Sequence, residues 1–140
     1  MLVGNYDMNI DAKGRVNIPA KFRSALGEVF VAAVGDERCV CLYPLDEWSA
    51  FMDRINSVGV EDRAMVMRYI QHNSAECEAD SQGRVVIPPV IREYAELSKE
   101  IVVVGEHKKV EIWSRDNWTK YADKEFDMDK LTGIMKQIGI

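Results

Sequence analysis

The chain has 140 residues, of which 47% are hydrophobic, which suits one compact domain better than two domains with separate cores. Its net charge of −5 at pH 7 argues against a protein that coats nucleic acid indiscriminately. No apolar run reaches the roughly 18 residues of a membrane-spanning helix, and no basic segment followed by an apolar one opens the chain. We therefore expect a cytoplasmic protein without a membrane anchor.

The first predicted elements are two strands joined by a tight turn. Residues 5–10 alternate between polar and apolar types, which is typical of a half-buried strand. Next comes Asp11-Ala-Lys-Gly-Arg-Val-Asn-Ile-Pro19, whose Gly14 suits a tight turn because glycine adopts positive φ without steric cost. Val16 and Ile18 resume the alternation, and Pro19 can start a short helix at its first position.

This motif occurs a second time, as Asp80-Ser-Gln-Gly-Arg-Val-Val-Ile-Pro88, 69 residues further along. The match continues at an offset of 70, where Trp48 corresponds to Trp118. Self-similarity of this length indicates an internal duplication. We divide the chain into a first repeat (1–57), a connecting helix (58–73), a second repeat (74–126) and a C-terminal tail (127–140).

Each repeat is predicted to continue with two strands and an amphipathic helix. The strands are expected at 29–34 and 39–43, and at 101–105 and 109–113. Apolar residues at helical spacing predict helices over 48–55 and 118–126, in which Trp48 and Trp118 are expected to anchor the core. The connecting helix at 61–72 has one apolar side and is expected to cover the sheet.

The two copies of the motif differ in charge. Positions 11–23 hold four cations against one carboxylate, whereas positions 80–92 hold two against one; the four are Lys13, Arg15, Lys21 and Arg23. Such a cluster is either a solvated surface or a site for an anionic partner. In each copy the aspartate is expected to accept hydrogen bonds from the turn and to pair with the arginine four residues later.

Catalytic and metal chemistry receive little support. His72 and His107 have no partner at ligand spacing, and no glycine-rich phosphate loop is present. Cys39, Cys41 and Cys77 lack the spacing of a zinc site and are expected to be reduced thiols. The sequence therefore predicts no enzyme, no cofactor, no metal and no small-molecule substrate.

Two copies of Asp-x-x-Gly-Arg-x-x-Ile-Pro, each trailed by a strand pair and an aromatic helix, resemble the MraZ family of the AbrB-like group. The resemblance covers residues 1–126 and includes three further segments: Tyr43-Pro-Leu-Asp-Glu-Trp48, Ala75-Glu-Cys-Glu-Ala-Asp80 and Val85-Val-Ile-Pro-Pro89. It implies an α+β fold, namely a duplicated swapped-hairpin β-barrel with peripheral helices. It also implies a nucleoid-associated transcriptional regulator that assembles into homo-oligomeric rings and binds direct repeats in the promoter of the division and cell-wall gene cluster.

The resemblance maps contact with double-stranded DNA onto the loop 11–15, where Lys13 and Arg15 flank Gly14. An arginine there could bond guanine O6 and N7 while Lys13, Lys21 or Arg23 holds phosphates. Gln82 replaces Lys13 in the second copy, which favours a structural or oligomer role for that loop. The motif residues expected to serve structure are Asp11, Asp80, Gly83 and Arg84. An antitoxin-like protein-binding module is the alternative function.

Overall fold

The computed structural model describes residues 2–140, apart from the Glu125 side chain, and has a mixed α+β fold. Its main sheet is antiparallel, with strand order β1-β7-β8-β4-β3-β5. These strands are β1 (Leu2–Asn9), β3 (Val29–Val34), β4 (Val40–Pro44), β5 (Ser74–Glu78), β7 (Glu100–His107) and β8 (Lys109–Ser114). Two shorter strands, β2 (Arg15–Asn17) and β6 (Arg84–Val86), pair with each other in a separate sheet, which we call the ribbon.

The helices follow the strands in a regular order: α1 (Ala20–Leu26), α2 (Leu45–Ile55), α3 (Val60–His72), α4 (Pro89–Tyr94), α5 (Arg115–Glu125) and α6 (Met128–Gln137). The predicted strands and the helices at 48–55, 61–72 and 118–126 are confirmed, with boundaries shifted by a few residues. Pro19 and Pro88 occupy the N-cap positions of α1 and α4 rather than the first helical position. Within the described residues, no helix combines the length and apolarity that crossing a bilayer requires.

Strands from residues 1–57 pair with strands from residues 74–126. β1 of the first repeat pairs with β7 of the second, placing Met8 opposite Ile101. β5 of the second repeat pairs with β3 of the first, placing Cys77 opposite Phe30. The β4–β8 pair joins the two sets at the centre of the sheet. Each repeat thereby completes the sheet of the other, as expected for halves too small to bury separate cores.

The main core lies between one face of the sheet, the ribbon, and the helices α1 and α4. Val16 and Val85 of the ribbon, together with Phe22 of α1, are fully buried. Leu42 and Ile112 meet them from the central strands and are also fully buried. Each large side chain removed from water in this way contributes roughly 1.5–3 kcal/mol to folding.

The expected closed barrel is wrong. The main sheet is open, with β1 and β5 as its edges, and these two strands do not pair with each other within residues 2–140. The segments that follow β1 and β5 do not extend the main sheet. They carry β2 and β6, which pair with each other over three residues and form the separate ribbon.

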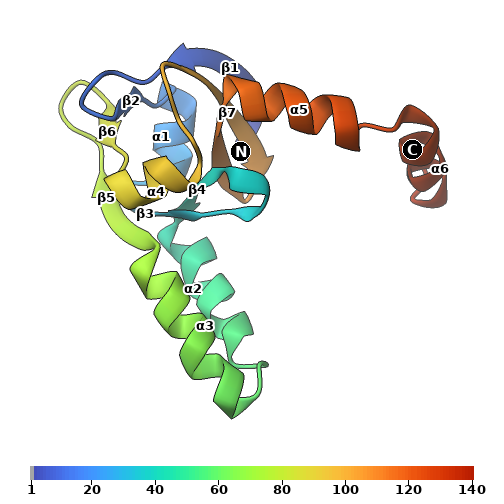
Figure 1. The fold of residues 1–140 in the computed structure, drawn as a ribbon, viewed down its shortest axis with the longest axis horizontal. Coiled ribbons are helices and arrows are strands. Elements are labelled where there is room, and N and C mark those ends of the chain that lie inside the picture. The colour runs from blue at the N-terminus through green and yellow to red at the C-terminus, as the bar shows by residue number, and fades with distance from the viewer. Residues whose placement is uncertain (1) are drawn as a thin grey trace.

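The expectation that the connecting helix covers the sheet is also wrong. Figure 1 shows α2 and α3 projecting together from the strand-rich body, and no residue of α3 is buried. Met65 and Tyr69 remain 65% and 54% exposed. Val66, Met67 and Ile70 of α3 are half-buried, and the other apolar side chains of this helix are exposed.

Trp48 and Trp118, which were predicted to anchor the core, lie outside the main core in half-buried aromatic clusters. Trp48 of α2 packs on Tyr43 at a ring separation of 5.4 Å. Trp118 of α5 packs on Trp113 at 5.5 Å, over the face of the sheet opposite the main core. These tryptophans therefore fasten helices to the outer face of the sheet.

The tail contains a helix that the sequence analysis did not predict. Asp127 caps α6 by accepting hydrogen bonds from the backbone N–H groups of Asp129 and Lys130. Figure 1 shows α6 standing off the body beyond the end of α5. Its apolar residues are exposed: Met128, Ile134, Met135 and Ile138.

Candidate nucleic-acid interface

We call residues 11–18 the first arm and residues 80–87 the second arm. In the first arm, Asp11 organises the turn before β2. Its Oδ1 accepts hydrogen bonds from the backbone N–H groups of Lys13 and Arg15, both at 2.9 Å. Its Oδ2 accepts a bond from Arg15 Nε at 2.6 Å. The backbone closes the same turn, since Gly14 N–H donates to the Asp11 carbonyl at 3.0 Å.

The second arm forms a turn of the same geometry. Asp80 Oδ1 accepts hydrogen bonds from the backbone N–H groups of Gln82 and Arg84 at 2.8 and 2.9 Å. Arg84 Nε donates to Asp80 Oδ2 at 2.8 Å. The predicted pairing of each aspartate with the arginine four residues later is thus confirmed in both arms.

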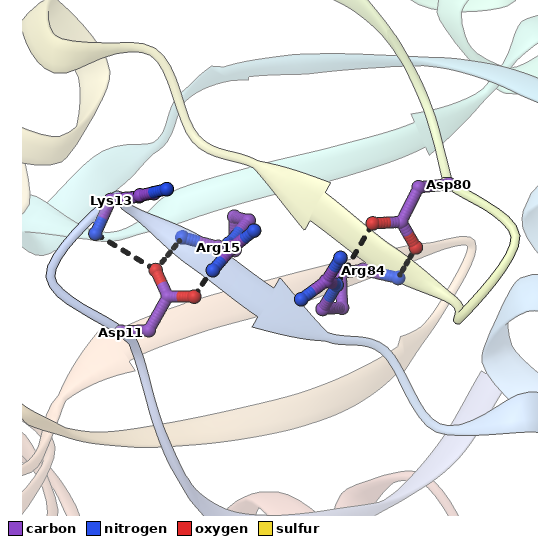
Figure 2. A network of polar contacts seen from close by, with 5 residues as sticks. All are labelled: Asp11, Lys13, Arg15, Asp80 and Arg84. Carbon is purple, nitrogen blue, oxygen red and sulfur yellow. Dashed lines mark hydrogen bonds and ion pairs between the residues drawn. The ribbon is translucent and has the colours of Figure 1, made fainter.

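The ribbon brings the two arms together. Val16 lies opposite Val85, Arg15 opposite Val86, and Asn17 opposite Arg84. Because side chains alternate along a strand, burying both valines turns Arg15 and Arg84 to the other side of the ribbon. Figure 2 shows the two arginines side by side on neighbouring strands, each held by its own aspartate. The outer face of the ribbon therefore presents two oriented guanidinium groups.

Within each arginine side chain, the aspartate engages only Nε. In residues 2–140 this leaves the two terminal nitrogens of Arg15 and of Arg84 without a protein acceptor. A guanidinium recognises a guanine through a pair of parallel N–H donors. The aspartates thus fix the direction of the arginine side chains and keep their outer donors available.

Hydrogen bonds keep both aspartates ionised. The backbone hydrogen bond from Arg15 is the main cause that lowers the pKa of Asp11 below its usual value. The backbone bond from Arg84 does the same to the pKa of Asp80. Both carboxylates therefore remain acceptors at neutral pH.

The two arms are also locked together through their glycines. Ile18 N–H donates to the Gly83 carbonyl at 3.2 Å, and Ile87 N–H donates to the Gly14 carbonyl at 2.9 Å. The Arg92 guanidinium lies against Gly14, and that of Arg23 lies against Gly83, where an added Cβ would meet it. Both glycines have positive φ, +77° and +79°. The turns thus need glycine for their backbone and for the arginine of the other repeat.

The predicted DNA-contact residues fall into two groups. Lys13, Gly14 and Arg15 lie at the turn, with the Lys13 side chain exposed. Lys21 lies elsewhere, with its Nζ 5.5 Å from the centre of the Tyr6 ring on β1. Arg23 donates from Nε to the Ile18 carbonyl at 3.1 Å and supports the second arm. The structure therefore groups Lys13 with Arg15, and places Lys21 beside β1 and Arg23 against the second arm.

Two features of the interface were not predicted. The first is Arg92, which lies against Gly14 of the first arm as Arg23 lies against Gly83 of the second. Arg23 and Arg92 correspond at an offset of 69, and this correspondence could have indicated that they have the same role. The second is the position of Arg84 beside Arg15. The residues of one motif do not reveal with which other strand the motif will pair. The sequence therefore could not show that the two arginines lie on one face.

Known proteins resemble this chain over nearly its full length. The model of the MraZ protein family, whose description also calls it antitoxin-like, matches residues 1–68 and 70–136. The chain belongs to the MraZ family. It is similar to proteins named "Transcriptional regulator MraZ" from Halothermothrix orenii, with 41% identity over all of both chains, and from Lachnoclostridium phytofermentans, with 40% identity over all of this chain and 99% of the relative.

A third relative of the same name, from Desulfitobacterium hafniense, is 43% identical over 91% of this chain and 90% of its own. These relatives are named as transcriptional regulators, which agrees with the expectation of a regulator rather than an enzyme. The predicted family membership is confirmed.

We predict that Gly14→Ala destabilises the protein by roughly 1–2 kcal/mol, because a side chain is strained at positive φ and its Cβ would displace the Arg92 guanidinium. The matched control is Gly59→Ala, where φ is −57° and no atom lies within 4 Å of the added Cβ. Urea denaturation measures both free energies of unfolding. Equal losses in the two variants would contradict the role assigned to Gly14.

Proposed function

We propose that the outer face of the ribbon is the surface that binds double-stranded DNA and reads its sequence. The observation that carries this proposal is the pair of arginines, Arg15 and Arg84, oriented side by side by Asp11 and Asp80. The major groove admits a two-stranded β-ribbon, and an arginine paired with guanine O6 and N7 is the commonest specific contact there. The exchange of β2 and β6 between the repeats supports the swapped-hairpin interpretation of this surface.

The first arm supplies the additional positive charge. Lys13 is exposed at the first turn, where the second turn has the neutral Gln82. A lysine beside the reading arginine suits a phosphate contact, which positions the protein without selecting a sequence. Arg23 bonds the Ile18 carbonyl and lies against Gly83, so we assign it to support of the arms. Lys21 lies beside Tyr6 of β1, and we leave it as an outer phosphate contact.

This proposal gives Arg84 a role in DNA contact, whereas the sequence favoured a structural role. Its contacts to Asp80 match those of Arg15 to Asp11, and its side chain is about as exposed, 33% against 29%. We therefore infer that both arginines meet the DNA and that the arms differ mainly by the charge of Lys13.

We expect Arg15→Ala to abolish specific DNA binding, since one bidentate contact contributes roughly 1–3 kcal/mol of discrimination. Lys13→Gln should weaken binding to all sequences alike and lower the salt dependence by about one unit of slope. Gln82→Lys adds at the second turn the charge that Lys13→Gln removes at the first, and it should strengthen DNA binding. Anisotropy titrations at several salt concentrations, on the DNA upstream of the chain's own gene, measure these effects.

Melting temperatures of the same variants serve as the control for folding. Unchanged affinity in Arg15→Ala at an unchanged melting temperature would overturn the ribbon as the DNA-binding surface. Arg84→Ala decides the remaining point: a loss of affinity supports contact by both arms, whereas a loss of stability alone supports the structural role.

We propose that the protein forms a homo-oligomer, as a ring of head-to-tail contacts. Its support is the unusual exposure of apolar residues on two projecting elements. Val60, Met65 and Tyr69 are exposed on α3, and Met128 and Ile138 are exposed at α6. Two different surfaces that cover each other form a heterologous contact, which closes into a ring when the rotation between subunits allows it.

Light scattering of the purified protein should therefore give a mass that is a multiple of the chain mass. Tyr69→Glu should reduce this mass because it places a charge on the apolar side of α3. The control is Gln71→Glu, which adds the same charge at a nearby exposed position that is already polar. A monomer at micromolar concentration, or equal effects of both variants, would contradict the proposed contact.

A ring would also explain how a small ribbon binds firmly enough. One ribbon makes few contacts, but linked ribbons on one DNA bind with a high effective concentration. We propose accordingly that the targets are promoter direct repeats, in the division and cell-wall gene cluster that the family implies, and that the protein acts at the nucleoid in the cytoplasm.

Binding should then rise steeply with the number of repeats that are in phase. Neighbouring ribbons meet the same side of the duplex when repeats recur after roughly 10 base pairs, or about 34 Å. Inserting roughly 5 base pairs turns the second repeat to the far side and should cost much of the affinity. A binding series on one, two and three repeats tests this. The multivalent mechanism fails if one repeat binds as tightly as three.

A protein-binding function of the antitoxin type remains the second candidate. The family description and the exposed apolar residues of α3 favour it. It would be supported if the protein captured another protein tightly and bound no DNA in the titrations above.

A further inference from the structure

The outer face of the central strands holds a cluster of thiols that neither the core nor the DNA surface uses. Cys39 and Cys41 are two residues apart on β4 and its approach, and Cys41 lies opposite Glu111 of β8. The two Sγ atoms and a carboxylate oxygen of Glu111 all lie within 4.8 Å of one another. Cys39 and Cys41 are 1% and 0% exposed, so this convergence of donor atoms is buried.

Space for the two sulfurs is provided by Gly35. A Cβ on this residue would lie 2.5 Å from Cys41 Sγ and 2.9 Å from Cys39 Sγ. The φ of Gly35 is −108°, an extended backbone that any residue adopts. Glycine is therefore required here by the thiols and not by the backbone.

The carboxylate is held in position by two neighbours. Trp113 Nε1 donates a hydrogen bond to Glu111 Oε1 at 3.1 Å. Lys109 Nζ lies 3.7 Å from Glu111 Oε2. The indole N–H therefore fixes one carboxylate oxygen, and the other pairs with Lys109.

A disulfide between the two cysteines fits this site poorly. Because the cysteines are two residues apart in extended backbone, their Cα atoms are separated by about 6.6 Å. This separation is near the upper limit of roughly 6.8 Å for a disulfide. Both side chains point the same way from an extended strand, which suits two separate ligands better than one covalent bond. Both cysteines are free in the structure.

We propose that Cys39, Cys41 and Glu111 form a binding site for zinc. Two sulfurs and one carboxylate oxygen are donors that Zn²⁺ accepts, and water can take the fourth position. Tetrahedral zinc with bonds of about 2.3 Å to sulfur needs the two sulfurs about 3.8 Å apart. The observed limit of 4.8 Å allows this with side-chain rotation alone.

Binding replaces the two thiol protons by one Zn²⁺ and changes no oxidation state. The Cys39 thiol gives up its hydrogen bond to the Asp36 carbonyl, now 3.2 Å long. Lys109 moves away from Glu111 toward solvent, which its 26% exposed side chain permits. Since β4 and β8 come from different repeats, the metal would fasten the two repeats together at the centre of the sheet.

The test is titration of the full-length, reduced protein with Co²⁺, a spectroscopic substitute for zinc, followed by displacement with Zn²⁺. We expect one ion per chain, a thiolate-to-cobalt charge-transfer band, and a zinc-dependent rise in melting temperature. Cys41→Ser and Glu111→Gln should each weaken zinc binding at least tenfold, as loss of a ligand should cost no less than the roughly 10–100-fold typical of outer-shell changes.

Cys77→Ala is the matched control, because it removes a buried thiol from the main core and should leave zinc binding unchanged. Glu111→Gln decides the outcome if Cys41→Ser does not fold. The proposal is overturned if no charge-transfer band forms, if Glu111→Gln binds zinc as the parent does, or if Cys77→Ala abolishes binding. A protein isolated two hydrogens lighter, with Cys39 and Cys41 joined, would also overturn it.

Discussion

Val16 and Val85 face each other across the ribbon, and both are fully buried against the core. Their burial fixes the register of β2 on β6, because a slip of one residue would bring Arg15 and Arg84 into the core and expose the valines. The bonds from Ile18 and Ile87 to the glycine carbonyls of the opposite arms hold the same register from its two ends. The contact between Val16 and Val85 therefore determines how the ribbon packs on the core and which of its side chains face solvent.

The aspartate–arginine pairs serve orientation more than stability. Exposed ion pairs of this kind contribute only about 0–1 kcal/mol, and the side chains of Asp11 and Asp80 are each 39% exposed. Their contribution is geometric, since a long arginine side chain held at Nε loses less freedom when its outer nitrogens meet a base. The same pairing lowers the net positive charge of each arm, which favours selective contact over binding to any phosphate backbone.

The sequence predicts local structure here better than it predicts which strands and helices pack against each other. The turns, the strand at 29–34 and the helix at 61–72 follow from glycine placement and apolar periodicity, and the structure confirms them. Periodicity does not reveal that β2 pairs with β6, that the sheet stays open, or that α3 projects from the body, because these depend on contacts between distant segments. Cysteine spacing likewise does not reveal the convergence of Cys39, Cys41 and Glu111, since Glu111 meets the thiols from another strand.

The internal duplication expected from the sequence accounts for the chemical difference between the two proposed sites. At an offset of 70, Cys39 and Cys41 correspond to Lys109 and Glu111, while Val40 and Leu42 correspond to Val110 and Ile112. The apolar positions stay similar because both repeats pack into one core, where a change of volume is costly. The positions between them face outward or toward the helices and have diverged, as Lys13 and Gln82 have in the arms. The antiparallel β4–β8 pair then sets the diverged copies opposite each other, so that thiols from one repeat meet a carboxylate from the other.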